Sequence, residues 1–435
     1  MSFPLMAATQ HRYCVTVVVL GDLGRSPRML NHALALAGDG AEVWLAGYSE
    51  TPLERAVLDH PRIRVCRIAA IGRAKEGTSR FRFLLTSGVR AVFLWFQVLW
   101  LLLARTPRGG ALLVQNPPSL PTLPVGWLAA RLRGSLFIVD WHNFGYAMLA
   151  LRLGPKHFAV QMTKACERLF GRKADAHFCV SMAMRDILVS EFGVPAPIAL
   201  YDRPRELLPL VPISSRSAFA GGVLARAGFV FPAGAVLAVC PTSWTADEDM
   251  DLLLEGLRQW DSTPAISPGL RLLVLITGRG PLREAFERRL SGVHWQRVEV
   301  RTAFLDPAGY RELLCAAHFG FCMHRSSSGV DLPMKVMDLF GARTPVCAFD
   351  YGACLAEQLQ PGFTGLTFQT SQELALRIDE LLHGFPGEMD VLERLQQGIV
   401  ASCTQTWEQV WQREAAPAFR PISRDTSGNI GAGKS

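Results

Sequence analysis

Short apolar runs alternate with longer amphipathic stretches along most of the chain. The first run, at residues 15–20, ends in a glycine turn, and a helical pattern follows over 29–37. Further apolar runs lie at 43–46, 63–66, 112–115, 136–140 and 177–180, and helical periodicity is clear at 160–170 and 182–192. Strands separated by helices are typical of a parallel sheet that is covered on both faces.

A second alternation begins beyond a segment spotted with glycine and proline, 211–232, which predicts a linker. Its predicted strands lie at 235–240, 272–277, 298–301, 319–323, 346–349 and 366–368, and its helices at 249–260, 281–290, 308–317 and 333–341. The expected fold class is therefore α/β, with two doubly wound, Rossmann-like domains, 1–210 and 233–400, that face each other across a cleft. A helix at 401–420 is expected to return to the first domain, and 421–435 to form a disordered tail.

Composition narrows the class of partner. The chain has 435 residues, a formal net charge of +7 and a pI near 9.0, which favours an anionic partner: a phosphosugar, a nucleotide, an anionic lipid surface or a nucleic acid. Nucleic acid ranks last, because the basic residues are dispersed and form no aromatic-basic motif of RNA-binding type. The ten cysteines are scattered without zinc-site spacing and indicate reduced core residues of a cytosolic chain.

Two parts of the sequence decide whether membrane contact is expected. The N-terminus is too short and too weakly apolar for a signal peptide or a membrane span, so we expect a cytoplasmic chain without a transmembrane anchor. Residues 89–104 are apolar nearly all round and flanked by arginines, but fall short of the roughly 20 residues needed to cross a bilayer. They suit either a helix in the headgroup region or a helix buried in the protein, and both interpretations stay open. In the first case, peripheral membrane contact runs through 81–105.

The stretch 324–341, HRSSSGVDLPMKVMDLFG, predicts an anion site. It follows a predicted strand and leads into a helix, so backbone N–H groups and the positive end of the helix dipole face any ligand there. Hydroxyls and a lysine suit phosphates, and two carboxylates suit sugar hydroxyls. These residues are Ser326, Ser327, Ser328, Gly329, Lys335, Asp331 and Asp338. The alternative is an ordinary Ser/Gly turn in which Asp331 caps the helix.

Two other strand ends of the second domain carry similar chemistry. Small residues that let a ligand approach the backbone, together with one arginine, follow these strands: Thr242, Ser243, Trp244, Gly278 and Arg279. Convergence of three strand ends favours one phosphate site. The acidic run 247–251 lies at a predicted helix N-terminus, where acids complement the dipole, so we interpret it as capping and expect no metal site.

In the first domain, Gly21, Gly24 and Arg25 follow the first strand. Their G-x-x-G spacing is not the dinucleotide fingerprint, so a nicotinamide or flavin cofactor is not expected. A glycine turn followed by two arginines, Arg25 and Arg28, suits a diphosphate instead, although solvent-facing arginines in such a loop are common.

A second cluster of the first domain follows the strand at 136–140. Its polar side chains are Asp140, His142, Asn143 and Tyr146. An imidazole can accept a proton near neutral pH when a carboxylate orients it, so His142 is a candidate base. A structural role for the histidine is the alternative.

Six strings, in order, carry a family resemblance: VVVLGDLGRSPRM, LLVQNPPSLPTLP, FIVDWHNFGY, TSWTADEDMDLLL, ITGRGPLRE and HRSSSGVDLPMKVMDLFG. They resemble the chitobiosyldiphosphodolichol beta-mannosyltransferases of glycosyltransferase family 33, from about residue 15 to 411. The resemblance implies a GT-B fold and an inverting, metal-independent transfer of mannose from GDP-mannose. The implied acceptor is GlcNAc2 on a diphosphate-linked polyprenol at the cytosolic face of a membrane.

Some features depart from the family or its neighbours. Animal and fungal members begin with a membrane anchor and carry a longer insertion before the second domain. Retaining GT-B families have a pair of glutamates eight residues apart, where this chain has Ser328 and Val336. A prokaryotic enzyme of another lipid-linked glycan or surface polysaccharide, or a non-catalytic nucleotide-sugar-binding scaffold, are the alternatives. The location is then the endoplasmic reticulum for a eukaryotic chain and the inner membrane for a bacterial one.

The resemblance also suggests roles. The second domain is expected to bind the GDP-sugar, with Arg279, Lys335 and the helix N-terminus stabilising the leaving diphosphate in place of a metal. The first domain is expected to face the acceptor, with His142 as base and Asp22 behind it. No cofactor is expected, and a complex with other glycosyltransferases of the same pathway is compatible with this assignment.

Overall fold

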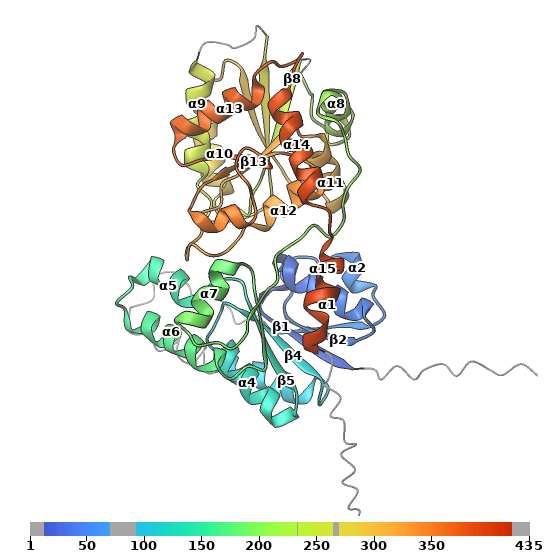
Figure 1. Cartoon of the computed structure of the whole chain (residues 1–435), viewed down its shortest axis with the longest axis vertical. Coiled ribbons are helices and arrows are strands. Elements are labelled where there is room, and N and C mark those ends of the chain that lie inside the picture. The colour runs from blue at the N-terminus through green and yellow to red at the C-terminus, as the bar shows by residue number, and fades with distance from the viewer. Residues whose placement is uncertain (1–12, 70–92, 233, 264–268, 420–435) are drawn as a thin grey trace, which may run out of the picture.

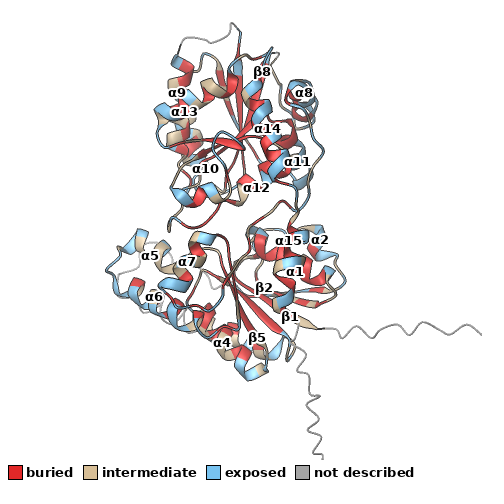
Figure 2. Cartoon of the chain, in the orientation of Figure 1, coloured by how far each residue is buried: buried red, intermediate tan, exposed pale blue. Residues whose placement is uncertain are grey.

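The computed structural model describes residues 13–69, 93–232, 234–263 and 269–419. These residues form two α/β domains stacked along the long axis of the molecule (Figure 1). The strands form the buried centre of each domain and the helices carry the exposed faces (Figure 2). The predicted fold class, two Rossmann-like domains with parallel sheets, is confirmed.

Within the described residues, the first domain has a seven-stranded parallel sheet in the order β3-β2-β1-β4-β5-β6-β7. Its strands are β1 (Cys14–Asp22), β2 (Glu42–Tyr48), β3 (Ile63–Arg67), β4 (Ala111–Asn116), β5 (Leu136–Trp141), β6 (Ala176–Cys179) and β7 (Ile198–Ala199). The strand order reverses between β1 and β4, which is where open sheets of this kind bind ligands. Val17 and Val18 of β1 face opposite cores, because successive side chains of a strand alternate between the two faces.

Helices cover both faces of this sheet. They are η1 (Leu23–Arg25), α1 (Pro27–Gly38), α2 (Arg55–Leu58), α4 (Thr122–Arg133), α5 (Gly145–Leu153), α6 (Phe158–Gly171) and α7 (Met182–Ser190). The first turn of α1 has a proline at N1, which is preorganised for a helix start. α1 packs on one face, whereas α4 and α7 pack on the other.

The second domain repeats this order. In the described residues, its six parallel strands run β10-β9-β8-β11-β12-β13. They are β8 (Ala235–Pro241), β9 (Arg271–Thr277), β10 (Val298–Ala303), β11 (Phe319–Cys322), β12 (Val346–Phe349) and β13 (Gly365–Phe368). The helices are α9 (Met250–Ser262), α10 (Arg283–Leu290), α11 (Pro307–Ala316), α12 (Met334–Gly341), η3 (Ala353–Glu357), α13 (Ser371–Leu382) and α14 (Asp390–Ser402).

The segment 211–232, which the sequence predicted as a linker, contains η2 (Ile213–Ser215) and α8 (Arg216–Arg226). Ala220, Val223 and Leu224 of α8 are buried in the core of the second domain. This part of the chain therefore stabilises the second domain as well as connecting to it.

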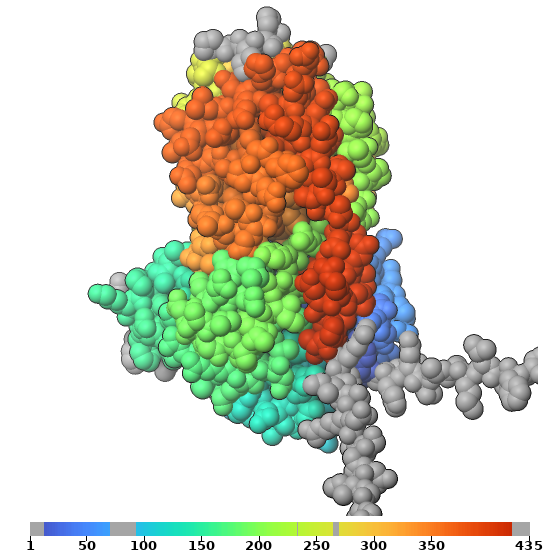
Figure 3. All heavy atoms as spheres, viewed as in Figure 1, coloured from blue at the N-terminus to red at the C-terminus, as the bar shows by residue number. Residues whose placement is uncertain are grey.

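The chain returns to the first domain at its end. After α14, the helices α15 (Trp407–Glu414) and α16 (Ala416–Phe419) pack on the first domain, where Trp407, Trp411 and Phe419 are buried with α1. The C-terminal segment is visible on the surface of both domains (Figure 3). The predicted tail 421–435 lies outside the described residues.

The predicted apolar segment 89–104 is described from residue 93 onward, and 93–104 is helical. Val98, Leu101 and Leu102 are buried against the first domain, whereas Phe93, Phe96 and Trp100 are each more than half exposed. One face of this helix therefore belongs to the core and the other does not. Among the described helices, none combines the length and apolarity that crossing a bilayer requires.

Candidate active site

The carboxyl ends of the two sheets meet at the junction between the domains, and predicted site residues form polar contacts across it. Arg25 Nη2 donates to the carbonyl oxygen of Arg279 at 3.0 Å, and Asn143 Nδ2 donates to the hydroxyl of Ser327 at 3.0 Å. The predicted acceptor-side and donor-side residues are thus brought together, although each pair is separated by more than 180 residues in sequence.

The N-terminus of α7 forms a second crossing. Ser181 donates to the carbonyl oxygen of Val330 at 2.6 Å, and the Glu357 carboxylate of the second domain accepts from the backbone N–H groups of Met182 and Ala183 at 2.7 and 2.9 Å. A carboxylate at a helix N-terminus complements both the unpaired N–H groups and the dipole. The interaction therefore favours this arrangement of the two domains.

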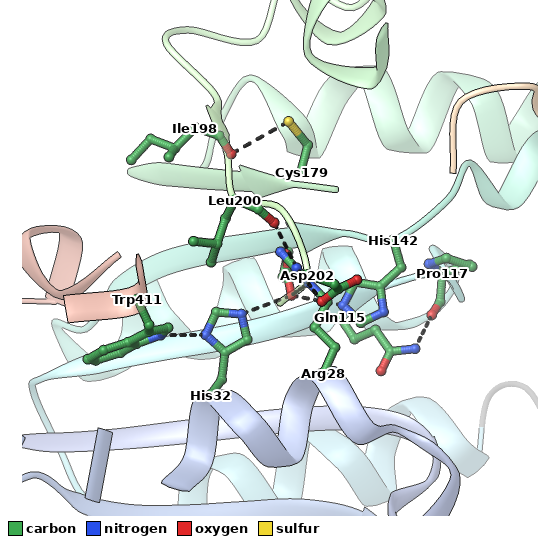
Figure 4. A network of polar contacts seen from close by, with 11 residues as sticks. Arg28, His32, Gln115, Pro117, His142, Cys179, Ile198, Leu200, Asp202 and Trp411 are labelled. Carbon is green, nitrogen blue, oxygen red and sulfur yellow. Dashed lines mark hydrogen bonds and ion pairs between the residues drawn. The ribbon is translucent and has the colours of Figure 1, made fainter. Parts of the chain in front are cut away.

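His142 lies at the carboxyl end of β5, and its Nε2 is 2.8 Å from Oδ2 of Asp140 (Figure 4). Asp140 is completely buried, whereas the His142 side chain is 21% exposed. Asp140 also accepts from Nε and Nη2 of Arg28, each at 2.9 Å, and lies 3.1 Å from His32 Nε2. Arg28 is therefore buried in this network and is not open to a diphosphate, contrary to the prediction. The geometry holds the Nε2 edge of the His142 ring against a fixed carboxylate, and the side chain remains partly exposed.

Asp140 is ionised in this network. Burial acts to raise its pKa, but the Arg28 charge and the two histidines outweigh burial and hold the pKa well below its usual range. An ionised carboxylate only accepts hydrogen bonds, so His142 donates through Nε2–H, and its Nδ1 is left as the proton acceptor. His32 is fixed likewise: its Nδ1 accepts from Trp411 Nε1 at 3.0 Å, and burial lowers its pKa.

Asp22, predicted to stand behind His142, is placed elsewhere. Its carboxylate accepts from the backbone N–H groups of Glu50 and Thr51 at 3.1 Å, so it fixes the loop after β2. Asp140 occupies the position that the sequence assigned to Asp22. Gly24 lies against this same loop, where a Cβ would approach within 2.8 Å of the Thr51 side chain, while Gly21 borders more open space.

A buried carboxylate that sequence reasoning missed supports the His142 loop. Glu167 of α6 accepts from Asn116 Nδ2 at 2.9 Å, from the Ser119 hydroxyl at 2.7 Å and from the Gly145 N–H at 2.7 Å. It is fully buried, and burial raises its pKa. Tyr146, predicted to face the acceptor, is half-buried in an aromatic cluster that includes Phe144.

Lys335, in the first turn of α12, forms an ion pair with Glu248. Glu248 is buried and also accepts from the Thr242 hydroxyl and from the Ser243 N–H at 2.8 Å. This carboxylate, also missed, joins the loop after β8 to the start of α12. The Lys335 ammonium is thereby positioned at a helix N-terminus whose Ncap, Pro333, provides no side-chain cap.

The loops after β8 and β9 pack closely. A Cβ on Gly278 would lie 1.8 Å from the Thr242 carbonyl oxygen, and Gly278 has φ +125°, so glycine is required there. Trp244, predicted near the donor, is completely buried and donates to the Gly278 carbonyl at 3.2 Å. The Arg279 guanidinium lies 3.5 Å from the centre of the Phe304 ring and stays exposed at the junction.

His324 lies two residues after the end of β11 and between two carboxylates. Its Nε2 is 2.8 Å from Asp331 and its Nδ1 is 3.4 Å from Asp247. Burial alone would lower the His324 pKa, but the two carboxylates outweigh it and raise the pKa to about 9, so the ring is a cation near neutral pH. Although the sequence missed His324, its strand-end position is the signal that selected His142.

The remaining predicted residues lie on the turn before α12 and on α12 itself. Ser326 and Ser328 donate to Asp331, Gly329 has φ +77° and donates its N–H to Ser326, and Asp338 is exposed and accepts from Tyr310 at 3.2 Å. Asp331 thus organises the Ser/Gly turn and does not cap α12.

The acidic run 247–251 also acts locally. Asp249 caps α9 by accepting from the Leu252 N–H at 2.9 Å, which confirms the capping prediction for this residue. Within the part of the chain that the structure describes, His, Cys, Asp and Glu side chains form no group of three or more suited to a metal ion.

Taken together, the junction presents an oriented imidazole from one domain and a lysine-bearing helix N-terminus from the other. An imidazole and an ammonium group on opposite sides of one junction, linked by the Asn143–Ser327 contact, suit transfer of a group from a phosphate-linked donor to a hydroxyl.

Comparison with known proteins agrees with this chemistry. Residues 24–200 match the model of the "Glycosyl transferase 4-like domain" family. A chitobiosyldiphosphodolichol beta-mannosyltransferase from Pongo abelii is 36% identical, covering 93% of this chain and 92% of its own, and the Homo sapiens protein of the same name is 35% identical with the same coverage. A protein named UDP-glycosyltransferase TURAN, from Arabidopsis thaliana, is 35% identical over 93% of this chain and 97% of its own.

Solved structures agree with the fold. A sucrose-phosphate synthase from Thermosynechococcus elongatus has a TM-score of 0.62 at 16% identity, covering 92% of this chain and 97% of its own. Anabaena Alr3699/HepE in complex with UDP-glucose has a TM-score of 0.60 at 14% identity, covering 93% and 98%.

Proposed function

The chain belongs to the chitobiosyldiphosphodolichol beta-mannosyltransferases, and from that premise we propose that it transfers mannose from GDP-mannose to a chitobiosyl group linked through a diphosphate to a polyprenol. It is a glycosyltransferase, and the proposal concerns its donor, acceptor and stereochemistry. We propose inversion at the mannose C1, giving a β-1,4 linkage, at the cytosolic face of a membrane and without a metal.

The observation that carries the proposal is the His142–Asp140 pair, which lies beside the Asn143–Ser327 contact at the junction. Inversion requires a base on the side of C1 opposite the diphosphate. His142 Nδ1 accepts the proton of the acceptor hydroxyl, the hydroxyl oxygen bonds to C1, and the bond from C1 to the diphosphate oxygen breaks. Asp140 fixes the ring and stabilises the imidazolium that forms.

Negative charge then develops on the departing GDP. The Lys335 ammonium, the N–H groups at the start of α12 and the Arg279 guanidinium supply the compensating charge from the second domain. Glu248 maintains the position of Lys335 through the ion pair between them. Ser327 and Ser328 are expected at the phosphates, while Asp331 and Asp338 are expected at sugar hydroxyls.

The test is transfer from GDP-mannose to a synthetic chitobiosyl-diphosphate lipid in the presence of EDTA, with the product anomer read by NMR. We expect a β-mannoside, a loss of at least about a hundredfold in kcat for His142→Ala, and a comparable loss for Lys335→Ala. His383→Ala, which changes an exposed histidine of the second domain, is the matched control. An α-linked product, or full activity of His142→Ala, would contradict the mechanism.

The donor needs its own test, because one relative carries the name UDP-glycosyltransferase. GDP-mannose, UDP-glucose and UDP-GlcNAc compared at equal concentration separate a GDP-mannose enzyme from one that uses a UDP-sugar. Transfer from a UDP-sugar alone would overturn the proposed donor and leave the glycosyltransferase assignment intact.

A further inference from the structure

Helix α5 is apolar, but only Tyr146 and Ala147, in its first turn, pack against the core of the first domain. Its sequence is GYAMLALRL, and none of its nine residues is buried. Met148, Leu151 and Leu153 are 46%, 73% and 45% exposed. A helix of this composition normally packs its apolar side chains inside a protein, so its exposure calls for an external partner.

The start of α6 continues the same surface. α5 and α6 pack against each other as a hairpin, residues 145–171, which projects at one edge of the first domain (Figures 1 and 3). Phe158 and Met162, one helical turn apart on α6, are 77% and 44% exposed. Large exposed side chains on both helices therefore flank the Gly-Pro-Lys-His turn that joins them.

The charge of this hairpin identifies the partner. Exposed basic residues lie between the apolar side chains in the sequence, at Arg152 and Lys156. The hairpin's one acid, Glu167, is buried beneath the His142 loop, and the neighbouring acid Glu191 pairs with Lys164, so neither offsets Arg152 and Lys156. Apolar side chains next to basic ones are typical of segments that lie in the headgroup region of an anionic bilayer. A second copy of this surface would instead oppose positive charge to positive charge.

The hairpin is also fixed to the active site. α5 begins at Gly145, three residues after His142, and the Gly145 N–H donates to Glu167 of α6 at 2.7 Å. A bilayer that contacts the hairpin is thus held beside the loop that carries the proposed base.

We propose that the α5–α6 hairpin docks the first domain on an anionic lipid bilayer and so presents the diphosphate headgroup of a lipid-linked acceptor to His142. The use of this surface for substrate delivery rests on the proposed function, whereas docking itself does not. The surface is additional to the predicted contact through 81–105.

The experiment is cosedimentation of the full chain with phosphatidylcholine vesicles, with and without phosphatidylglycerol. We expect binding that requires the anionic lipid and weakens with salt. Leu151→Glu/Phe158→Glu should lower the partition coefficient at least about tenfold, because two exposed anchors become anions at an anionic surface. Leu376→Glu, at a 64% exposed position of α13, is the matched control and should bind as the wild type does.

Vesicle binding is measured without substrate, so a chain that fails to bind vesicles does not by that result contradict the proposed enzymatic function. Arg152→Gln/Lys156→Gln, which keeps the apolar side chains, should weaken binding and its salt dependence. The proposal is overturned if the wild-type chain does not bind anionic vesicles, or if Leu151→Glu/Phe158→Glu binds as tightly as the wild type. It is also overturned if that variant only dissociates a dimer seen by size exclusion. For the substrate role, the same variant should lose activity on a long-chain acceptor in vesicles and keep it on a short, water-soluble one.

Discussion

The cationic His324 between Asp331 and Asp247 predicts that the second domain becomes less stable as pH rises above neutrality. The folded-state pKa of about 9 lies above the ordinary value of 6.5, so the protonated ring stabilises the fold. This contribution is complete below about pH 6.5 and is lost as pH rises through 9. The interval between the two pKa values, at about 1.4 kcal/mol per pKa unit, sets an upper bound of about 3 kcal/mol.

The window for the measurement follows from the other titrating groups. By the same linkage relation, the protonated His324 stabilises the fold by about 3 kcal/mol near pH 6 and by about 1 kcal/mol near pH 8.5. Burial lowers the pKa of His177 and His318 to about 4, so these histidines titrate below the window. Burial raises the pKa of the Cys166 and Cys354 thiols to about 12, so ionisation of thiols in the unfolded chain destabilises the fold only toward pH 9 and above.

The assay is urea denaturation of the wild type and His324→Gln at several pH values between about 6 and 8.5. Fluorescence of Trp244 and Trp260, both completely buried in the second domain, reports on unfolding. We expect the stability difference between the two proteins to shrink by about 2 kcal/mol across this range. His383→Gln, at an exposed position, controls for the loss of an imidazole as such. A wild-type advantage that is constant or grows with pH would refute the charged-histidine argument.

Three further predictions concern the junction. Gly280→Ala places a Cβ 1.9 Å from a backbone carbonyl oxygen of the neighbouring loop, so we expect a lower Tm and a higher KM for the donor. The control Gly221→Ala has open space around it and should be neutral or stabilise the fold by up to about 1 kcal/mol. Arg25→Lys loses the planar donor that contacts the second domain, so kcat/KM should fall about fivefold with no change in Tm; equal activity would show that the contact is dispensable. A double-mutant cycle of Asn143→Ala and Ser327→Ala should give a coupling energy of about 0.5–1.5 kcal/mol in kcat/KM, and additive losses would show that the pair does not act together.

Both sheets were predictable because parallel strands that are buried on both faces consist of short apolar runs in the sequence. The helix α8 was harder to predict from the sequence. Gly221 and Gly222 lower helix propensity, but burial of Ala220, Val223 and Leu224 overrides it. Local preference gave way to tertiary packing at this segment.

The rule that ligands bind beyond the carboxyl ends of parallel strands located His142 and Lys335 in the sequence, because it depends only on the order of strands and helices. It could not identify the partners of these side chains. Glu167 and Glu248 look like surface acids in a helix and in a capping run, and only the folded chain shows that they are buried. Trp244 shows the converse error: it follows a strand, but it is completely buried and is not open to a ligand in this structure.

The return of α15 and α16 to the first domain has a consequence for biosynthesis. Trp411 fills the core beside α1 and holds His32 against Asp140, yet it is translated after the whole second domain. The half of the protein that leaves the ribosome first therefore cannot complete its own interior until residues 407–419 have followed. The hydrogen bond from Trp411 that orients His32 toward Asp140 forms only at the end of synthesis, and a nascent chain that stops at α14 has both sheets but lacks this support of the network around Asp140.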